Sequence, residues 1–549
     1  MPSAKAGRRL RDRLPVRLRH HWKPATALGV GLAAMVYFLG DARISPYVTS
    51  SSRVEADAIT DNVQGTVDLY DTSVSHSIQL AYQQTDFDKM MKEFKDDGTK
   101  DYIEADLTID GVYLNDVGIR LKGNSTLSSL RGAKGMPGGG RDMPQGGQGA
   151  PAGGAPGGAA GKEAGAGTGA AGKGQKAGGQ GQGQKAAGGQ GQKAGGKGGM
   201  GGMMQFNLSA KKPEELPWLV KVDEYVEGRA YQGEREISLR PGSNGQVPAN
   251  EALSLSLTDE SGQKAERYAF TKLKVNNRPT AARLMVEAPD TDYADDVSGG
   301  NAVLYKARAS GSFEYKGDDP SDYETSFKQL NKKGSQDLEP VMKLIKWVSK
   351  ASDKEFARDL DTYVDVDSFA KYVASQNLLL NFDDMAGPGK NYLLSYDLDT
   401  KKFSVLGWDY NLTFSGDATT GPDDSVGMGG GMPGGAPGGA AQGKQGGGDA
   451  DADAGAKGGM GGMGGRMQHV LKSKFLDSDA FDGVYQKAYG ELYQRFYGSG
   501  TAAKNLKQIA DQARKAGADS KEFDTAVTKL QKTVTDRNAA LAKNKKVTG

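Results

Sequence analysis

Alternation of apolar and polar positions predicts a β-rich first half of the folded chain. The clearest strands are residues 102–109 and 112–121, which flank Asp110-Gly111, a dipeptide typical of tight hairpins. In the second strand apolar residues alternate with Arg120 and Lys122, so we expect one apolar face and one basic face. Further strands are predicted at 217–222, 235–240, 268–275 and 281–287.

Beyond residue 323 the apolar positions recur at helical spacing. One predicted helix opens near Asp337, a residue type that caps helices, and a second spans 367–380. The other predicted elements are a helix at 86–94, a strand pair at 391–396 and 403–408, and helical segments at 466–496 and 501–545. A β-rich half followed by an α-rich half predicts an α+β fold with two lobes.

Glycine interrupts this pattern twice. Of the 80 glycines, 31 lie in 132–204 and 20 in 421–465, which leaves 29 for the other 431 residues, an ordinary share of about 7%. Such tracts bury too little apolar area to offset chain entropy, so we predict disorder over 132–204 and 417–465. These two inserts delimit a folded domain at 57–416 and a C-terminal helical region at 466–549.

The N-terminus has the pattern of a membrane signal. Residues 1–23 hold eight Lys or Arg and one acid, and residues 24–40 carry no charge. This length is at the short end of a bilayer span, and the positive-inside rule places the basic tail in the cytoplasm. We predict a single-pass signal anchor in the cell membrane with an extracytoplasmic domain, and a cleaved signal peptide is the alternative.

Composition excludes several kinds of chemistry. The chain has no cysteine, which excludes disulfides and thiolate metal sites. It has four histidines, two of them in the basic tail, which leaves little for a Ser-His-Asp triad. A net charge of +2 gives no global field that would favour nucleic acid, so no nucleic-acid partner is expected.

Acids and amides gather around one predicted hairpin. The order along the chain is Asp383 (or Asp384), Asn391, two strands, and Asp409, the order in which protein kinases place a catalytic Asp, an Asn and a metal-binding Asp. If paired residue numbers sum to 800, Asn391 lies opposite Asp409, whereas a register shifted by one residue separates them. Ordinary turn and capping roles account for the same residue types.

Several motifs resemble the spore-coat protein H (CotH) kinase family over roughly 102–416, apart from the first insert. They are Arg120-Leu-Lys-Gly-Asn-Ser-Thr126, Leu216-Pro-Trp-Leu-Val-Lys-Val-Asp223, Tyr231-Gln-Gly, Ile237-Ser-Leu-Arg240, Asn250-Glu-Ala-Leu, Leu304-Tyr-Lys306, Asn381-Phe-Asp383, Gly387-Pro-Gly-Lys-Asn391 and Trp408-Asp-Tyr-Asn411. The resemblance implies an atypical, secretory-type protein kinase. Such a kinase would transfer phosphate from ATP to Ser or Thr of extracytoplasmic proteins, with Mg²⁺ or Mn²⁺.

The resemblance also implies roles for individual residues on the hairpin side. Asp383 matches the catalytic-loop aspartate of the family, and Asp409 matches the metal-binding aspartate. Asn391 and Asn411 occupy the positions of the accompanying amides, although an acid is common where Asn411 stands.

On the strand side, Glu251 matches a glutamate that resembles the lysine-pairing residue of kinases, and either Lys122 or Lys221 would hold nucleotide phosphates. Both lysines are equally explained as solvated strand residues. The sequence therefore predicts a membrane-anchored kinase with a protein substrate in the cell envelope. Two alternatives stay open: a catalytically inactive envelope scaffold, and a transferase of another group on the same fold.

Overall fold

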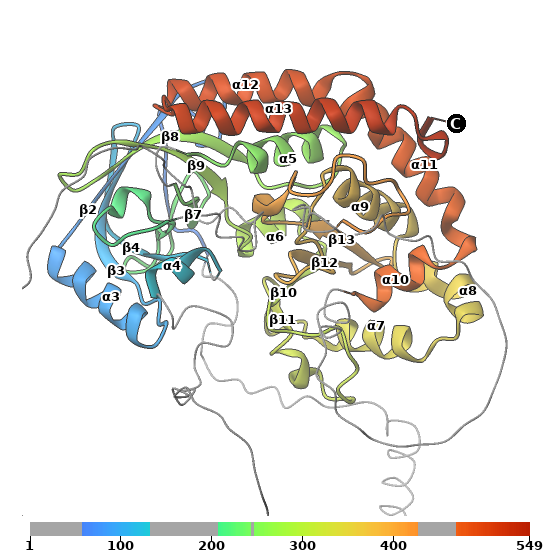
Figure 1. The fold of residues 1–549 in the computed structure, drawn as a ribbon. Coiled ribbons are helices and arrows are strands. Elements are labelled where there is room, and N and C mark those ends of the chain that lie inside the picture. The colour runs from blue at the N-terminus through green and yellow to red at the C-terminus, as the bar shows by residue number, and fades with distance from the viewer. Residues whose placement is uncertain (1–57, 124, 132–206, 243–245, 427–467, 549) are drawn as a thin grey trace, which may run out of the picture.

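The computed structural model describes residues 58–123, 125–131, 207–242, 246–426 and 468–548. They form a β-barrel half and a second half in which helices surround a smaller sheet, which agrees with the predicted α+β class (Figure 1). The predicted signal anchor at 24–40 and most of both glycine-rich segments lie outside the described residues. No helix within the described ranges is long and apolar enough to cross a membrane.

The barrel is closed by seven strands and filled with apolar side chains. In spatial order they are β2 (His76–Tyr82), β3 (Ile103–Ile109), β4 (Val112–Leu121), β5 (Trp218–Lys221), β7 (Glu236–Leu239), β9 (Ala281–Glu287) and β8 (Tyr268–Val275). The hairpin predicted around Asp110-Gly111 is confirmed as β3–β4, and β8 and β9 have the predicted bounds. Helix α3 (Gln84–Asp96) adds its buried face to the barrel core. A short parallel pair, β1 (Asp61–Val63) and β6 (Arg229–Tyr231), lies beside the barrel.

Helix α5 (Ala249–Glu260) was not predicted, and its surroundings explain why. It packs between the barrel and α12 (Thr501–Lys515), so residues on nearly every side of the helix are buried. A helix buried all round has no amphipathic stripe, and the stripe is the signal that sequence periodicity detects. Figure 1 shows α5 beneath the long C-terminal helices.

The smaller sheet decides between the two hairpin registers that the sequence left open. Its order is β11 (Phe327–Gln329), β10 (Ala302–Ala307), β12 (Tyr392–Asp397) and β13 (Phe403–Gly407). Tyr392 pairs with Gly407, so paired numbers sum to 799 and the register is the one shifted by one residue. The observed register gathers Tyr392 and Val405 in the main core and pairs Leu393 with Leu406 on the opposite face.

The helices that follow the barrel agree with the predicted periodicity, with two corrections. The helices predicted near Asp337 and over 367–380 are α7 (Glu339–Lys350) and α9 (Val366–Leu378). The predicted segment 466–496 is interrupted at 477–481, and 501–545 is interrupted by Gly517, whose positive φ of 97° ends a helix. The remaining helices are α4 (Ser128–Arg131), α6 (Thr291–Ser298), α8 (Asp353–Tyr363), α10 (Val470–Leu476), α11 (Asp482–Tyr493), α13 (Lys521–Leu541) and α14 (Lys545–Thr548).

The C-terminal helices contact the middle of the chain through one buried arginine. Arg537 of α13 has no exposed surface, and its guanidinium donates hydrogen bonds to the main-chain carbonyls of Asn377 and Thr420. The Asn377 side chain in turn donates to the Gly421 carbonyl at 3.0 Å. Residues 417–426, the start of the segment predicted to be disordered, are therefore described and packed, and the folded part continues to residue 426.

Candidate active site

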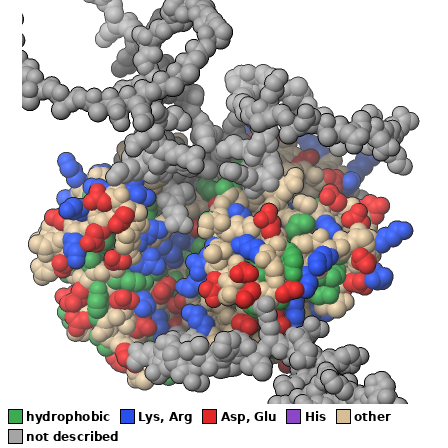
Figure 2. All heavy atoms as spheres, turned by 90° about the horizontal axis from the view of Figure 1, so that it is seen from below, with side chains coloured by type: hydrophobic (Ala, Val, Ile, Leu, Met, Phe, Trp, Pro, Cys, Tyr) green, Lys and Arg blue, Asp and Glu red, His purple; other side chains and the backbone are tan. Residues whose placement is uncertain are grey.

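A charged cluster lies where the barrel meets the second half of the molecule. Arg240 directly follows β7 and is buried, and its Nη2 atom lies 2.5 Å from Glu251 Oε1 in the first turn of α5. The same nitrogen lies 3.6 Å from Asp409 Oδ1, which comes shortly after β13. Arg240 therefore joins a carboxylate of the barrel side to a carboxylate of the hairpin side. Lysine and arginine side chains gather in the hollow between the two halves (Figure 2).

The family resemblance implied that Glu251 pairs with a lysine. In the structure Glu251 forms its ion pair with Arg240 instead. The Glu251 side chain is 1% exposed, and burial raises its pKa to about 7 while the Arg240 charge opposes the rise. The sequence placed Arg240 at the end of a predicted strand and in one of the family motifs, but it indicated no role for this residue. Its two partners come from other segments of the chain, which a local pattern does not reveal.

The structure distinguishes the two candidate lysines. Lys122 follows β4 on the side of the cluster, where burial and the Arg240 charge together lower its pKa to about 8. Lys221 instead forms an ion pair with Glu224 at 2.7 Å. Burial alone would lower the pKa of Lys221, but this ion pair raises it. The structure brings Lys122 to the cluster and leaves Lys221 with partners of its own.

Asp383 lies in the loop after α9, and the same loop holds its carboxylate in place. One oxygen accepts a hydrogen bond from the Gly389 N–H, and the other accepts from Asn391 Nδ2 at 3.1 Å. Burial raises the pKa of Asp383 to about 6. Asp384 forms an ion pair with Lys472 of α10 instead. The two acids therefore have different partners: Asp383 accepts from the hairpin amide Asn391, and Asp384 pairs with a helix lysine.

An unusual backbone conformation brings Asp409 close to Asn391. The observed register continues to place Asn391 opposite Trp408, yet Asn391 Nδ2 lies 3.4 Å from the Asp409 carbonyl. Asp409 has a φ of 55°, in the left-handed region, so the chain turns sharply there. The two residues therefore meet in the shifted register, and the expectation that this register would separate them was wrong.

Asn411 adds a further side-chain amide oxygen on the hairpin side. Its main-chain carbonyl accepts a hydrogen bond from Asn250 at 2.9 Å, and its buried Oδ1 atom has no hydrogen-bond partner among the described residues. One carboxylate and side-chain amide oxygens suit Mg²⁺ or Mn²⁺, which prefer oxygen ligands. No group of three or more His, Asp or Glu side chains placed to hold a metal occurs within the described ranges. A divalent ion here would complete its coordination with phosphate oxygens and water.

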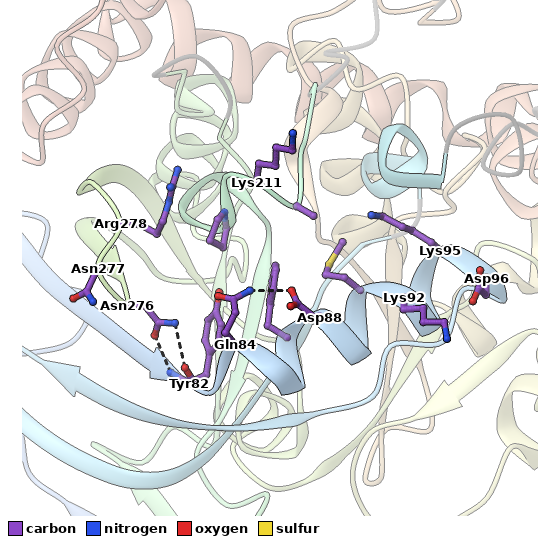
Figure 3. Close-up of a pocket in the computed structure, with 14 residues that line it drawn as sticks. Tyr82, Gln84, Asp88, Lys92, Lys95, Asp96, Lys211, Asn276, Asn277 and Arg278 are labelled. Carbon is purple, nitrogen blue, oxygen red and sulfur yellow. Dashed lines mark hydrogen bonds between the residues drawn. The ribbon is translucent and has the colours of Figure 1, made fainter.

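A cavity of about 990 Å³ lies against α3 and shares no residue with this cluster (Figure 3). It is lined by a mixture of apolar, acidic and basic side chains, including Tyr82, Asp88, Lys92 and Arg278. None of the seven residues predicted for catalysis, nucleotide binding or metal binding lines it. The charged cluster, rather than this cavity, is therefore the candidate active site.

Comparison with known proteins gives two matches. The sequence model of the family described as CotH kinase protein matches residues 205–541, more than half of the chain. That range contains Glu251, Asp383, Asn391 and Asp409 and ends in α13, whereas Lys122 precedes it. Inner spore coat protein H of Bacillus subtilis (strain 168) is 25% identical over 200 residues. The match covers 35% of this chain and 54% of that relative, about half of its length.

Proposed function

Because the chain belongs to the CotH kinase protein family, we propose that it is an ATP-dependent phosphotransferase with a two-lobed, kinase-like catalytic domain. The observation that carries the proposal is the meeting of Glu251, Arg240 and Asp409, with the Arg240 guanidinium 2.5 Å from one acid and 3.6 Å from the other. An ion pair on the barrel side beside an acid on the hairpin side is similar to the Lys–Glu pair and metal-binding Asp that protein kinases need, with Arg240 in place of the lysine.

Each side chain has a definite part in the proposed reaction. Asp383 would accept the proton of the attacking hydroxyl, since burial raises the pKa of its carboxyl and makes it a better base. Asp409, Asn391 and Asn411 would hold Mg²⁺ or Mn²⁺, which neutralises charge on the nucleotide phosphates. Lys122 and Arg240 add positive charge beside the same position, where it stabilises charge on the transferred group.

The acceptor and the location are proposed from the name of the matched relative and from the N-terminal sequence. The matched relative is named as an inner spore coat protein, and the N-terminal sequence has the pattern of a membrane anchor. We therefore propose Ser or Thr of a cell-envelope or coat-type protein as the acceptor, with the catalytic domain on the outer side of the membrane. No nucleic-acid partner is proposed.

The test is labelled phosphate transfer by the full-length protein with ATP and Mg²⁺ or Mn²⁺. We expect Asp383→Ala and Asp409→Ala to abolish transfer, because one removes the base and the other a metal ligand. Asp409→Ala should also lose metal-dependent nucleotide binding, whereas Asp383→Ala should keep it. Asp399→Ala, at the exposed turn of the same hairpin, is the matched control and should behave as wild type. Normal turnover in the Asp409 variant would refute the assignment.

One observation favours the inactive scaffold as the second candidate. Arg240 lies 3.6 Å from Asp409, and a cation at that distance competes with a metal ion for the carboxylate. An inactive scaffold would show no increase in nucleotide affinity on adding Mg²⁺ or Mn²⁺. A phosphotransferase would show that increase, and the increase would disappear in Asp409→Ala.

A further inference from the structure

A third cation, Lys306 of β10, points at the candidate site from the smaller sheet. Its Nζ atom lies 3.5 Å from the centre of the Trp408 ring, and Trp408 directly precedes Asp409. A lysine on an aromatic face is held by the quadrupole of the ring and keeps its charge available. Lys306 was part of a motif in the sequence, but no role followed from that motif.

The neighbours of Lys306 do not neutralise it. No carboxylate of the described residues lies within ion-pair distance of its Nζ atom, and the same holds for Lys122. Lys306 lies directly opposite Lys328 of the edge strand β11, so both lysines stand on one face of the sheet. Like charges directly opposite each other destabilise a pair of strands. An anion bound between Asp409 and these two lysines would offset the repulsion between the lysines.

The electrostatic environment agrees with an anion site. Burial and the Lys122 charge lower the pKa of Lys306 to about 7, although Asp409 opposes this change. Burial also lowers the pKa of Lys122, and the Arg240 charge acts in the same direction. Three cations from three strands thus converge on the position beside Asp409.

We propose that Lys306 is a phosphate-binding residue, resting on the face of Trp408 and binding the polyphosphate chain of a nucleotide that enters the site. The proposal rests on the proposed phosphotransferase function and extends it to a residue on the second sheet. Lys122 and Arg240 would contact the phosphates from the barrel side and Lys306 from the opposite side. A chain of several linked phosphates, rather than a single phosphate, is the ligand that spans such an arrangement of cations.

Isothermal titration of the full-length protein tests this proposal with three probes: ATP with Mg²⁺, inorganic tripolyphosphate with Mg²⁺, and adenosine. Lys306→Met should weaken ATP and tripolyphosphate between about tenfold and a hundredfold, the range for losing a hydrogen bond between charged groups. Adenosine affinity should not change, because adenosine has no phosphate. Lys306→Arg should restore most of the loss, since it keeps the charge.

Lys274→Met is the matched control, because Lys274 is an exposed lysine on β8 outside the cluster. It should bind all three probes as wild type does. Equal ATP affinity in wild type and Lys306→Met would overturn this inference and leave the phosphotransferase proposal standing. Equal losses for adenosine and ATP would also overturn it, since they would indicate a structural role. Wild-type binding of tripolyphosphate but not of ATP would instead refute the nucleotide-dependent function and keep Lys306 as a polyanion ligand.

Discussion

Gly389 shows how closely the backbone approaches the proposed base. A Cβ atom at this position would clash with the Asp383 carboxylate that the Gly389 N–H binds. We expect Gly389→Ala to displace Asp383 and reduce kcat by at least about a hundredfold, the usual cost of a misplaced catalytic group. Nucleotide binding should persist, because neither residue is proposed to hold nucleotide.

Steady-state kinetics together with nucleotide titration measure this effect. Gly483→Ala in α11 is the matched control, since a Cβ there meets no atom. An unchanged kcat in Gly389→Ala would contradict the assignment of Asp383 as the base. A loss of nucleotide affinity equal to the loss of kcat would indicate general disruption of the loop.

His76 makes the stability of the barrel depend on pH. Its ring is fully buried, with Nδ1 2.7 Å from Asp110 Oδ2 and Nε2 3.0 Å from the Asp71 carbonyl. Burial alone would lower the pKa of His76, but these two acceptors raise it above its usual value. Because the folded-state pKa is the higher one, the contribution is complete below about pH 6.5 and is lost as pH rises through the folded-state value.

We therefore expect the free energy of unfolding to fall between pH 6 and pH 8 more steeply in wild type than in His76→Gln. Urea unfolding at a series of pH values measures the difference. Asp110 acts at the acid end, where hydrogen bonds from His76 and Ser77 lower its pKa although burial opposes them, so its contribution is lost as pH falls. Parallel pH curves for the two proteins would show that the imidazole is neutral in the fold.

The sequence could identify the hairpin side of the site but not the barrel side. Asp383, Asn391 and Asp409 were predicted together because one hairpin brings them together, and that is local information. Arg240 was missed because its contacts with Glu251 and Asp409 depend on how the barrel packs against α5. The choice between Lys122 and Lys221 required the same tertiary information.

At the scale of single elements, the β12–β13 hairpin shows the limit of apolar alternation. Its two strands were predicted correctly. However, two pairing registers that differ by one residue both place apolar side chains opposite each other. The tertiary contacts of the two hairpin faces select one register. On one face Tyr392 and Val405 join the main core, and on the other Leu393 and Leu406 form a cluster with Tyr293. Nothing in the hairpin itself contains that information.

The segment at 417–426 gives an element-scale prediction about the second glycine-rich stretch. Replacing 427–467 with a short Gly/Ser linker should leave the melting temperature almost unchanged, because closure entropy changes only slowly with the length of a connection. Extending the deletion back to 417 should lower it by several degrees, since Arg537 and Asn377 would lose the carbonyls of Thr420 and Gly421. Thermal unfolding followed by circular dichroism compares the two. Equal melting temperatures would show that these carbonyls contribute nothing to stability.

At the scale of the whole molecule, the order of halves along the chain was predictable and their arrangement was not. A β-rich region followed by helices correctly indicated an α+β fold. The barrel closes because strand β8 pairs in parallel with β2, which lies nearly 200 residues earlier in the chain. No pattern in the sequence predicts such a distant pairing. Helix α5 was likewise not predictable from sequence periodicity, because its neighbours bury nearly every side of it.

The N-terminal signal leads to a prediction for the whole chain. Eight cations precede the uncharged segment 24–40, so the residues beyond it should be exported. Protease added to intact cells with a permeable outer envelope should digest the catalytic domain and spare a short basic stub. A full-length chain that resists protease in intact cells, yet is cleaved after lysis, would place the domain in the cytoplasm.

Arg537 has a consequence for the timing of activity. It binds carbonyls at the end of α9, the helix that leads into the Asp383 loop, and it comes more than 150 residues after them in the chain. A growing polypeptide therefore completes the barrel, the hairpin and the catalytic loop before the side chain that supports the loop has been synthesised. Until α13 docks, the Asn377 carbonyl accepts only from the Leu380 N–H at the end of α9 and lacks its bond to the Arg537 guanidinium. The protein would thus acquire its proposed catalytic competence late in biosynthesis, after its earlier elements have already folded.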